Sequence, residues 1–268
     1  MSRIKRDVGK FLSPTSKVKE MTMKVFLHGV PDTAHMWTPL ITELGLSPTE
    51  YETLSLPGFG CLVPAGFKTT KSNYATWLIG ELERIVDAHG GPIDLVGHDW
   101  GAILTARVAS LRPDLIKSLV FGGAAIDGAY RGHLFAWMWA TPVIGELFMA
   151  ISNSGTMKKS LMEQGLPEDL ATHEASAFDA TMKRSILQLY RSAAGLRGLG
   201  VWEKELENLP AKKLLIWGEK DPFVPLAVGE RFVSRWGGTL HIEKDIGHWG
   251  MSIRTKSVAP LLTEFWAG

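Results

Sequence analysis

The chain has 268 residues, of which 45% are hydrophobic, and its 29 basic side chains nearly balance its 28 acidic ones. This composition excludes a disordered or fibrous protein and predicts one large globular unit. A net charge of +1 provides no field that would recruit nucleic acid or an anionic membrane, so a small neutral organic partner is expected. The single cysteine, Cys61, excludes an intramolecular disulfide and a cysteine-cluster metal site, and it fits the reducing cytoplasm.

Two segments could carry a targeting or membrane signal. Residues 1–23 are basic but contain no apolar run of signal-peptide length, so a solvated arm or edge strands are predicted there. Residues 134–151 are apolar and long enough to be considered as a membrane span. Pro142 and Glu146 interrupt this run near its middle, which favours an apolar lid over a pocket.

Short β-rich runs alternate with helical patterns along most of the chain. Strands are predicted at 23–29, 51–60, 92–97, 116–123, 212–218 and 238–244. Helices are predicted at 73–89, 102–111 and 224–236. Because nearly continuous apolar strands are joined by helices, the pattern predicts an α/β fold in which both faces of a mostly parallel sheet are covered.

The pattern changes between residues 123 and 200, where no buried strand is apparent and the helical sequence is rich in Trp, Met, Phe and Leu. We therefore predict a first core part at 1–122, a helical cap at 123–200 and a second core part at 201–268. Insertions at the carboxyl ends of parallel strands commonly roof a binding crevice. Four cap residues are expected to line an apolar pocket, although packing alone would explain each of them: Trp137, Trp139, Phe148 and Met149.

Residues 95–104, LVGHDWGAIL, place a carboxylate in a tight turn between an apolar strand and a helix. Gly97 and Gly101 frame Asp99 as Gly-x-nucleophile-x-Gly, the elbow that lifts one side chain above a sheet at a helix N-terminus. The helix N-terminus favours the ionised carboxylate, so Asp99 is predicted to be a nucleophile. The alternative is a structural turn residue.

Five motifs resemble, in order, those of the α/β-hydrolases that use aspartate as nucleophile, a group that includes epoxide hydrolases and haloalkane dehalogenases. They are HGVPDTAHMW at 28–37, LPGFG at 56–60, GHDWGA at 97–102, WGEKDPFVP at 217–225 and IGHWG at 246–250. The resemblance covers most of the chain. It implies the α/β-hydrolase fold with an inserted helical lid and no cofactor.

The resemblance also implies a role for each matching residue. Asp99 would attack an electrophilic carbon, His248 would activate the water that hydrolyses the resulting ester, and Asp221 would orient the imidazole. The backbone N–H groups of Val30 and Trp100 would hold the oxyanion. Glu219 and Asp127 are alternative candidates for the acid. His28 and His98 are expected to be structural.

The leaving group decides which reaction is expected. Tyr190 resembles the lid tyrosine that donates a hydrogen bond to the epoxide oxygen in epoxide hydrolases. No tyrosine occupies the neighbourhood expected of a second donor, so Tyr130 and His133 are the candidates. The resemblance therefore predicts an epoxide hydrolase acting on a neutral, largely apolar epoxide.

Two alternative functions remain, a haloalkane dehalogenase and a small-molecule-binding protein. In a haloalkane dehalogenase, Trp100 together with Trp137 or Trp139 would bind the halide. A fluoroacetate dehalogenase is disfavoured because only Arg107 lies near the elbow. A small-molecule-binding protein of the same fold would show a broken triad, whereas the triad is complete here.

No dinucleotide fingerprint, phosphate loop or metal-ligand spacing occurs in the sequence, so neither a cofactor nor a metal is expected. The sequence leaves open whether the chain is a monomer or a homodimer.

Overall fold

A computed structural model describes residues 22–268, so most of the arm predicted at 1–23 lies outside the described residues. Within residues 22–268, six strands form one sheet with the order β2-β1-β3-β4-β5-β6, and every neighbouring pair is parallel. The predicted α/β class is therefore confirmed. The strands are β1 (Lys24–Leu27), β2 (Tyr51–Leu54), β3 (Ile93–His98), β4 (Ile116–Gly122), β5 (Lys213–Gly218) and β6 (Thr239–Glu243).

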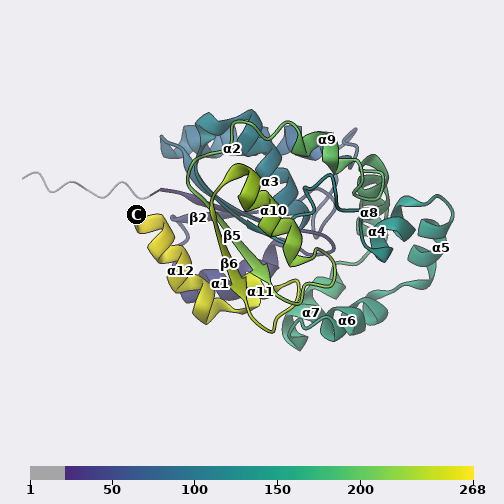
Figure 1. Ribbon diagram of the computed structural model, residues 1–268. Coiled ribbons are helices and arrows are strands. Elements are labelled where there is room, and N and C mark those ends of the chain that lie inside the picture. The colour runs from purple at the N-terminus through teal and green to yellow at the C-terminus, as the bar shows by residue number, and fades with distance from the viewer. Residues whose placement is uncertain (1–21) are drawn as a thin grey trace, which may run out of the picture.

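Helices cover both faces of the sheet (Figure 1). One face packs against α2 (Lys71–His89), α3 (Trp100–Leu111) and α10 (Leu226–Trp236). The other face packs against η1 (Ala34–Trp37), α1 (Thr38–Leu44), α11 (Gly250–Ile253) and α12 (Thr255–Ala267), and η2 (Pro113–Leu115) leads into β4.

The strands reach both layers because successive side chains point to opposite faces. In β4, Leu119 and Phe121 pack in the layer of α2 and α3, while Val120 packs in the opposite layer. All three side chains are fully buried, which explains why this strand is a nearly continuous apolar run in the sequence.

The helical insertion lies between β4 and β5, and we call it the cap. Its helices are α4 (Leu134–Ala140), α5 (Ile144–Ile151), α6 (Ser154–Glu163), α7 (Glu168–Ser176), α8 (Ala180–Ser192) and α9 (Leu199–Glu203). The two ends of the cap meet, because the N–H of Gly128 donates to Oε2 of Glu203 at 2.7 Å and the backbone of Gly200 lies against that of Gly128. The cap is thus joined to the core through a narrow neck.

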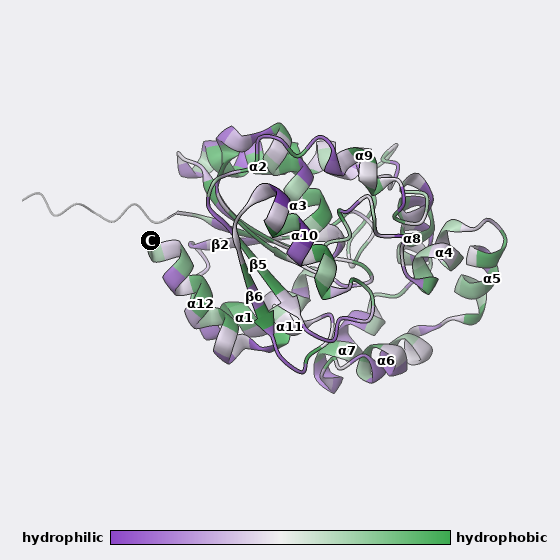
Figure 2. Ribbon diagram, in the orientation of Figure 1, coloured by the Kyte–Doolittle hydropathy of each residue, from purple (hydrophilic) through white to green (hydrophobic). Residues whose placement is uncertain are grey.

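Among residues 22–268, no single helix is long and apolar enough to cross a membrane. Only α4 and α5 taken together reach the required length and hydropathy, and these two helices are bent by 108° relative to each other. Figure 2 shows hydrophobic stretches on both helices at the end of the cap farthest from the C-terminus.

Candidate active site

Asp99 occupies the turn between β3 and α3. Its φ of 51° and ψ of −120° lie in a region that residues with a Cβ rarely adopt, as expected for a nucleophile elbow. The elbow also depends on glycine, because a Cβ at Gly101 would collide with the backbone of Leu27 and one at Gly29 would collide with the Asp99 side chain. The predicted Gly-x-Asp-x-Gly turn is therefore present, and its carboxylate lies at the carboxyl end of the central strand β3.

The other two predicted catalytic residues also follow the carboxyl ends of parallel strands, since Asp221 follows β5 and His248 follows β6. Nδ1 of His248 is 2.7 Å from Oδ2 of Asp221, and Nε2 of His248 is 3.5 Å from Oδ2 of Asp99. Oδ1 of Asp221 accepts the N–H groups of Phe223 at 2.8 Å and Val224 at 2.9 Å, which fixes the carboxylate. The structure thus brings Asp99, His248 and Asp221 together in one row, in which a hydrogen bond joins His248 to Asp221 and an ion-pair contact joins it to Asp99.

Electrostatic attraction between the imidazole and the two carboxylates sets the protonation states of Asp99 and His248. Burial acts to raise the pKa of Asp99, but the hydrogen bond and the charge of His248 outweigh it and hold that pKa below its ordinary value. Burial acts to lower the pKa of His248, but the charge and hydrogen bond of Asp221, together with those of Asp99, raise it to about 10. At neutral pH the resting site therefore holds an imidazolium between two carboxylates.

The predicted oxyanion donors lie beside Asp99. The N–H of Val30, in the loop that follows β1, donates to Oδ1 of Asp99 at 2.8 Å. Trp100 is the first residue of α3, so its N–H has no acceptor within the helix and is free to serve an oxygen at this position. An oxyanion formed at Oδ1 would therefore meet a donor that is already in place.

His28 and His98 are both buried and hydrogen-bonded, as the sequence predicts for structural histidines. Burial lowers the pKa of each to about 4, so both are neutral at pH 7. Nδ1 of His28 donates to the carbonyl of Gly29 at 2.7 Å, and its Nε2 accepts the N–H of Leu56 at 3.0 Å. Nε2 of His98 donates to the carbonyl of His248 at 2.9 Å and so holds the histidine loop.

Sequence reasoning missed two buried acids behind this site. Oδ1 of Asp32 accepts the indole N–H of Trp249 at 3.0 Å, and Oε2 of Glu174 in α7 accepts the N–H of Thr33 at 2.6 Å. Burial, reinforced by the charge of the neighbouring acid groups, raises the pKa of Asp32 to about 7 and that of Glu174 to about 8. Glu174 thereby joins the cap to the core, and no local pattern in the sequence marks it.

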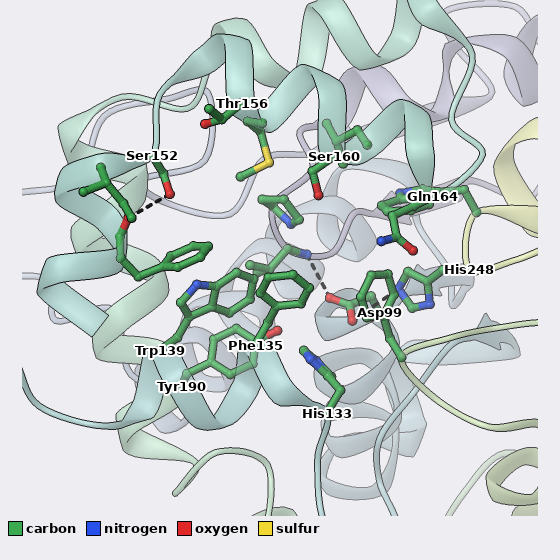
Figure 3. Close-up of a pocket in the computed structure, with 18 residues that line it drawn as sticks. Asp99, His133, Phe135, Trp139, Ser152, Thr156, Ser160, Gln164, Tyr190 and His248 are labelled. Atoms are coloured by element: carbon green, nitrogen blue, oxygen red, sulfur yellow. Dashed lines mark hydrogen bonds and ion pairs between the residues drawn. The ribbon is translucent and has the colours of Figure 1, made fainter. Parts of the chain in front are cut away.

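A cavity of about 290 Å³ lies between the core and the cap, directly above Asp99 and His248 (Figure 3). One wall is aromatic and consists of Phe135, Trp139, Phe148, Tyr190 and Phe223. Another wall carries polar side chains spaced four residues apart along and beside α6, namely Ser152, Thr156, Ser160 and Gln164. None of the described residues that line the cavity is Lys or Arg.

Two of the four predicted pocket residues, Trp139 and Phe148, line this cavity. Trp137 does not, because its ring lies on the outside of the cap with the guanidinium of Arg197 stacked 3.4 Å from its centroid. Met149 is buried in the core packing of the cap and does not line the cavity either. The expectation for these two residues is thus corrected.

Only two of the three candidate donors in the cap line the cavity. Tyr190 and His133 line the cavity, whereas the hydroxyl of Tyr130 donates to the carbonyl of Phe223 and Tyr130 does not line it. Burial and the charge of Asp99 raise the pKa of Tyr190, which keeps its phenol protonated.

His133 is also a neutral donor. Burial lowers its pKa to about 4. Its Nδ1 accepts the N–H of Ala136 at 3.2 Å, so the ring proton resides on Nε2. Of the two candidates for a second donor, His133 lines the cavity and Tyr130 does not.

Comparison with known proteins identifies the family. Residues 25–255 match the model of the alpha/beta hydrolase family, so the chain belongs to this family. Epoxide hydrolase 3 of Xenopus tropicalis is 22% identical over 274 residues, and the match covers 92% of this chain and 72% of that protein. An (E)-2-((N-methylformamido)methylene)succinate hydrolase of Acinetobacter baylyi is 31% identical over 109 residues, covering 40% of this chain and only 38% of that relative.

Solved structures share the fold at low sequence identity. The 2-hydroxy-6-oxo-6-phenylhexa-2,4-dienoate hydrolase BphD of Rhodococcus sp. strain RHA1 superposes with a TM-score of 0.76 at 19% identity, covering 93% of this chain and 92% of that one. The haloalkane dehalogenase DbeA of Bradyrhizobium elkani USDA94 gives a TM-score of 0.71 at 18% identity, with the same coverage. These similarities establish the α/β-hydrolase fold.

Proposed function

We propose that the protein is an epoxide hydrolase that converts a neutral, largely apolar epoxide to a vicinal diol through a covalent ester on Asp99. The observation that carries this proposal is the presence of two neutral donors, Tyr190 and His133, in the cavity that also holds the Asp99 carboxylate. An opening epoxide develops negative charge on oxygen, and donors aimed at that oxygen stabilise it.

The first step requires an ionised nucleophile and no base. Oδ2 of Asp99 attacks an epoxide carbon, the C–O bond of the ring breaks, and the electron pair passes to the ring oxygen. Tyr190 and His133 hydrogen-bond this oxygen, which takes a proton from the Tyr190 hydroxyl as it leaves the carbon, and the phenolate is reprotonated at the expense of the His248 imidazolium. Oδ1 becomes the ester carbonyl oxygen, and it is already held by the N–H of Val30 at 2.8 Å.

The second step requires a base. Ester formation removes the negative charge of Asp99, and this charge and its hydrogen bond are among the causes that raise the pKa of His248. Once these contributions are lost, the pKa of His248 falls, and the ring, having given up its Nε2 proton to replace the one taken by the epoxide oxygen, can accept a proton from water. Water then attacks the Asp99 carbonyl carbon as His248 takes its proton. The tetrahedral oxyanion collapses, the leaving oxygen takes this proton from His248, and the diol is released.

The lining of the cavity favours a neutral substrate. A carboxylate substrate needs a cationic partner in a site of this kind, and none of the described lining residues is Lys or Arg. Arg107, the cation nearest the elbow in sequence, pairs with Glu205 and does not line the cavity. These features disfavour fluoroacetate, and they also disfavour an anionic dienoate of the kind that BphD is named for.

A haloalkane dehalogenase is the second candidate. The indole N–H of Trp139 is buried and has no hydrogen-bond partner among residues 22–268, and Trp139 lines the cavity, whereas Trp100 does not line it and its ring packs edge-on against Tyr190. Weak donors of this kind suffice for a departing halide. The same Asp99 ester would form in this reaction, so the leaving group is the point of difference.

One experiment tests the mechanism and the substrate class together. Single-turnover reactions in heavy-oxygen water would compare a styrene-type epoxide with a haloalkane of similar size. We expect turnover of the epoxide, with the new product oxygen unlabelled because it comes from Asp99, and no reaction with Asp99→Ala. Labelled product in a single turnover would overturn the covalent mechanism. Halide release without epoxide turnover would select the dehalogenase, and binding without turnover of either would select a binding protein.

A further inference from the structure

The exposed surface of α4 and α5 is unusually apolar for the outside of a cap. Eleven large apolar side chains are exposed among the described residues, and six of them fall within the stretch 134–151. Exposed apolar residues that are scattered singly need no explanation, but a contiguous group indicates an interaction surface. We call this group the cap patch; it consists of Leu134, Trp137, Val143, Ile144, Leu147 and Ile151.

Helix α5 is apolar on both of its faces. Met149 faces the interior, while Ile144, Leu147 and Ile151 are 49%, 63% and 77% exposed. A surface helix normally carries polar side chains on its outer face. The only charged side chain of α5, Glu146, is paired with Arg191 at 2.7 Å, so it leaves no free charge beside the patch. In Figure 1, α5 lies at the outer end of the cap, away from the sheet.

The surroundings of the cap patch are cationic. Three basic side chains adjoin it from the neighbouring segments: Lys183, Arg191 and Arg197. The guanidinium of Arg197 stacks on the ring of Trp137, and Nζ of Lys183 donates to the carbonyl of Ser152 at the end of α5 at 2.6 Å. Glu146 is the only acid in α4 and α5. Because Glu146 neutralises Arg191, the excess positive charge beside the patch comes from Lys183 and Arg197, and the near-neutral total charge of the chain conceals it.

The catalytic cavity reaches the surface beside this patch. Ile151 is 77% exposed and also lines the cavity, together with its neighbours Phe148 and Ser152. We propose that the cap patch docks on the surface of an anionic lipid membrane, with the mouth of the cavity facing the lipid. An apolar substrate dissolved in the bilayer would then enter the cavity without crossing water.

The charges favour a lipid surface over a second copy of the chain. In a two-fold symmetric dimer the patch would meet itself, so the cations around it would face the same cations of the partner. An anionic bilayer instead complements these cations and accepts the aliphatic side chains between the headgroups. The docking depends only on the cap surface, so it holds whatever reaction Asp99 performs.

Vesicle flotation tests this proposal with the full chain. Vesicles of seven parts phosphatidylcholine to three parts phosphatidylglycerol would be compared with vesicles of pure phosphatidylcholine. We expect binding to the anionic vesicles that weakens at high salt. Ile144→Glu combined with Leu147→Glu should lower the partition coefficient by roughly a hundredfold, about tenfold for each aliphatic side chain withdrawn from lipid.

Leu62→Glu combined with Val201→Glu is the matched control. These side chains are 89% and 60% exposed and lie outside the cap patch, and the control adds the same two negative charges. It should reduce binding far less, and circular dichroism would verify that both variants fold. Failure of the wild type to bind anionic vesicles, or equal losses in both double variants, would overturn the proposal. A wild-type dimer that dissociates only on Ile144→Glu with Leu147→Glu would assign the patch to a second copy instead.

Discussion

Nε2 of His248 lies 3.5 Å from Oδ2 of Asp99, so the base proposed for the second step is placed against the nucleophile of the first. The opposite nitrogen is 2.7 Å from Asp221, and the two carboxylates together hold the imidazole protonated. In the proposed mechanism the ring would therefore become a base only after Asp99 has lost its charge, so the charges of the pair would set the order of the two chemical steps.

His248→Gln should form the ester but fail to hydrolyse it, because attack by Asp99 needs no base whereas attack by water does. Intact-protein mass spectrometry should then show the mass of the enzyme plus one substrate, and the adduct should persist. Asp99→Ala is the control and should show no adduct. If substrate binds to His248→Gln and no adduct appears, His248 has a different role.

Asp221→Asn should retain ester formation and slow hydrolysis by roughly a thousandfold or more, as expected when the residue that orients a catalytic imidazole loses its charge. The charge of Asp221 also raises the pKa of His248, so the rise of the hydrolysis rate with pH should move to lower pH in this variant. Stopped-flow measurement of the two steps checks both effects. Glu219→Gln, which alters an acid that accepts only the N–H of Asp245 at 3.1 Å, should leave both rates within about twofold of the wild type, as expected for a surface substitution.

Tyr190→Phe should slow epoxide opening by roughly a hundredfold, which is the usual effect of losing one donor to a developing oxyanion. His133→Phe should have a similar effect, and the double variant should retain little activity. Tyr130→Phe is the matched control, since its hydroxyl donates to the carbonyl of Phe223 and stays outside the cavity. Pre-steady-state rates of ester formation measure these effects, and equal losses for Tyr130→Phe and Tyr190→Phe would contradict the assignment.

Glu174 should make the stability of the protein fall as the pH rises. Burial and the charge of Asp32 raise the pKa of Glu174 from 4.5 to about 8 in the folded protein. Between these values the folded chain holds a proton that the unfolded chain has released, so the free energy of unfolding decreases with increasing pH across this window. Glu174→Gln removes this titration but keeps an oxygen for the N–H of Thr33, which Glu174 accepts at 2.6 Å.

The Tm of Glu174→Gln should therefore exceed that of the wild type above pH 8 by a few degrees, since 1 kcal/mol corresponds to about 2–4 °C in a chain of this size. The difference should shrink as the pH approaches 4.5. Glu168→Gln, in the same helix but exposed and paired with Lys158 at 2.8 Å, serves as the control and should lack this pH-dependent gain. Thermal unfolding followed by circular dichroism from pH 5 to pH 9 decides the matter, and parallel curves for wild type and Glu174→Gln would refute it.

The row of Asp99, His248 and Asp221 was predictable because its signals in the sequence are local. Asp99 lies in a strand-turn-helix pattern framed by glycines, and Asp221 and His248 each follow an apolar strand. Parallel strands bring these ends together at one edge of the sheet, so sequence order and strand type suffice to place them. All six predicted strands of the core overlap observed ones for the same reason, although the strand predicted at 51–60 already ends at Leu54.

The remainder of the site could not be predicted because it depends on contacts between distant segments. Glu174 meets Thr33 across 141 residues of sequence, and nothing near Glu174 indicates that it will be buried. The orientation of the cap helices decides that Trp139 faces the cavity while Trp137, two residues away, faces outward. Helical spacing gives the angle between such residues, but only packing against α8 fixes which of them points inward.

The backbones of Gly128 and Gly200 lie in contact, so the two ends of the cap are close enough for the whole cap to be replaced as one segment. Because both ends of the insertion leave the core at nearly one point, a cap of different length or sequence can be attached there without altering the spacing of β4 and β5. Asp99, His248 and Asp221 all lie outside this junction, whereas the aromatic and polar walls of the cavity lie mostly within it. If the proposed chemistry holds, a chimera that carries a relative's segment in place of 129–199 should therefore keep ester formation on Asp99 while accepting the relative's substrates.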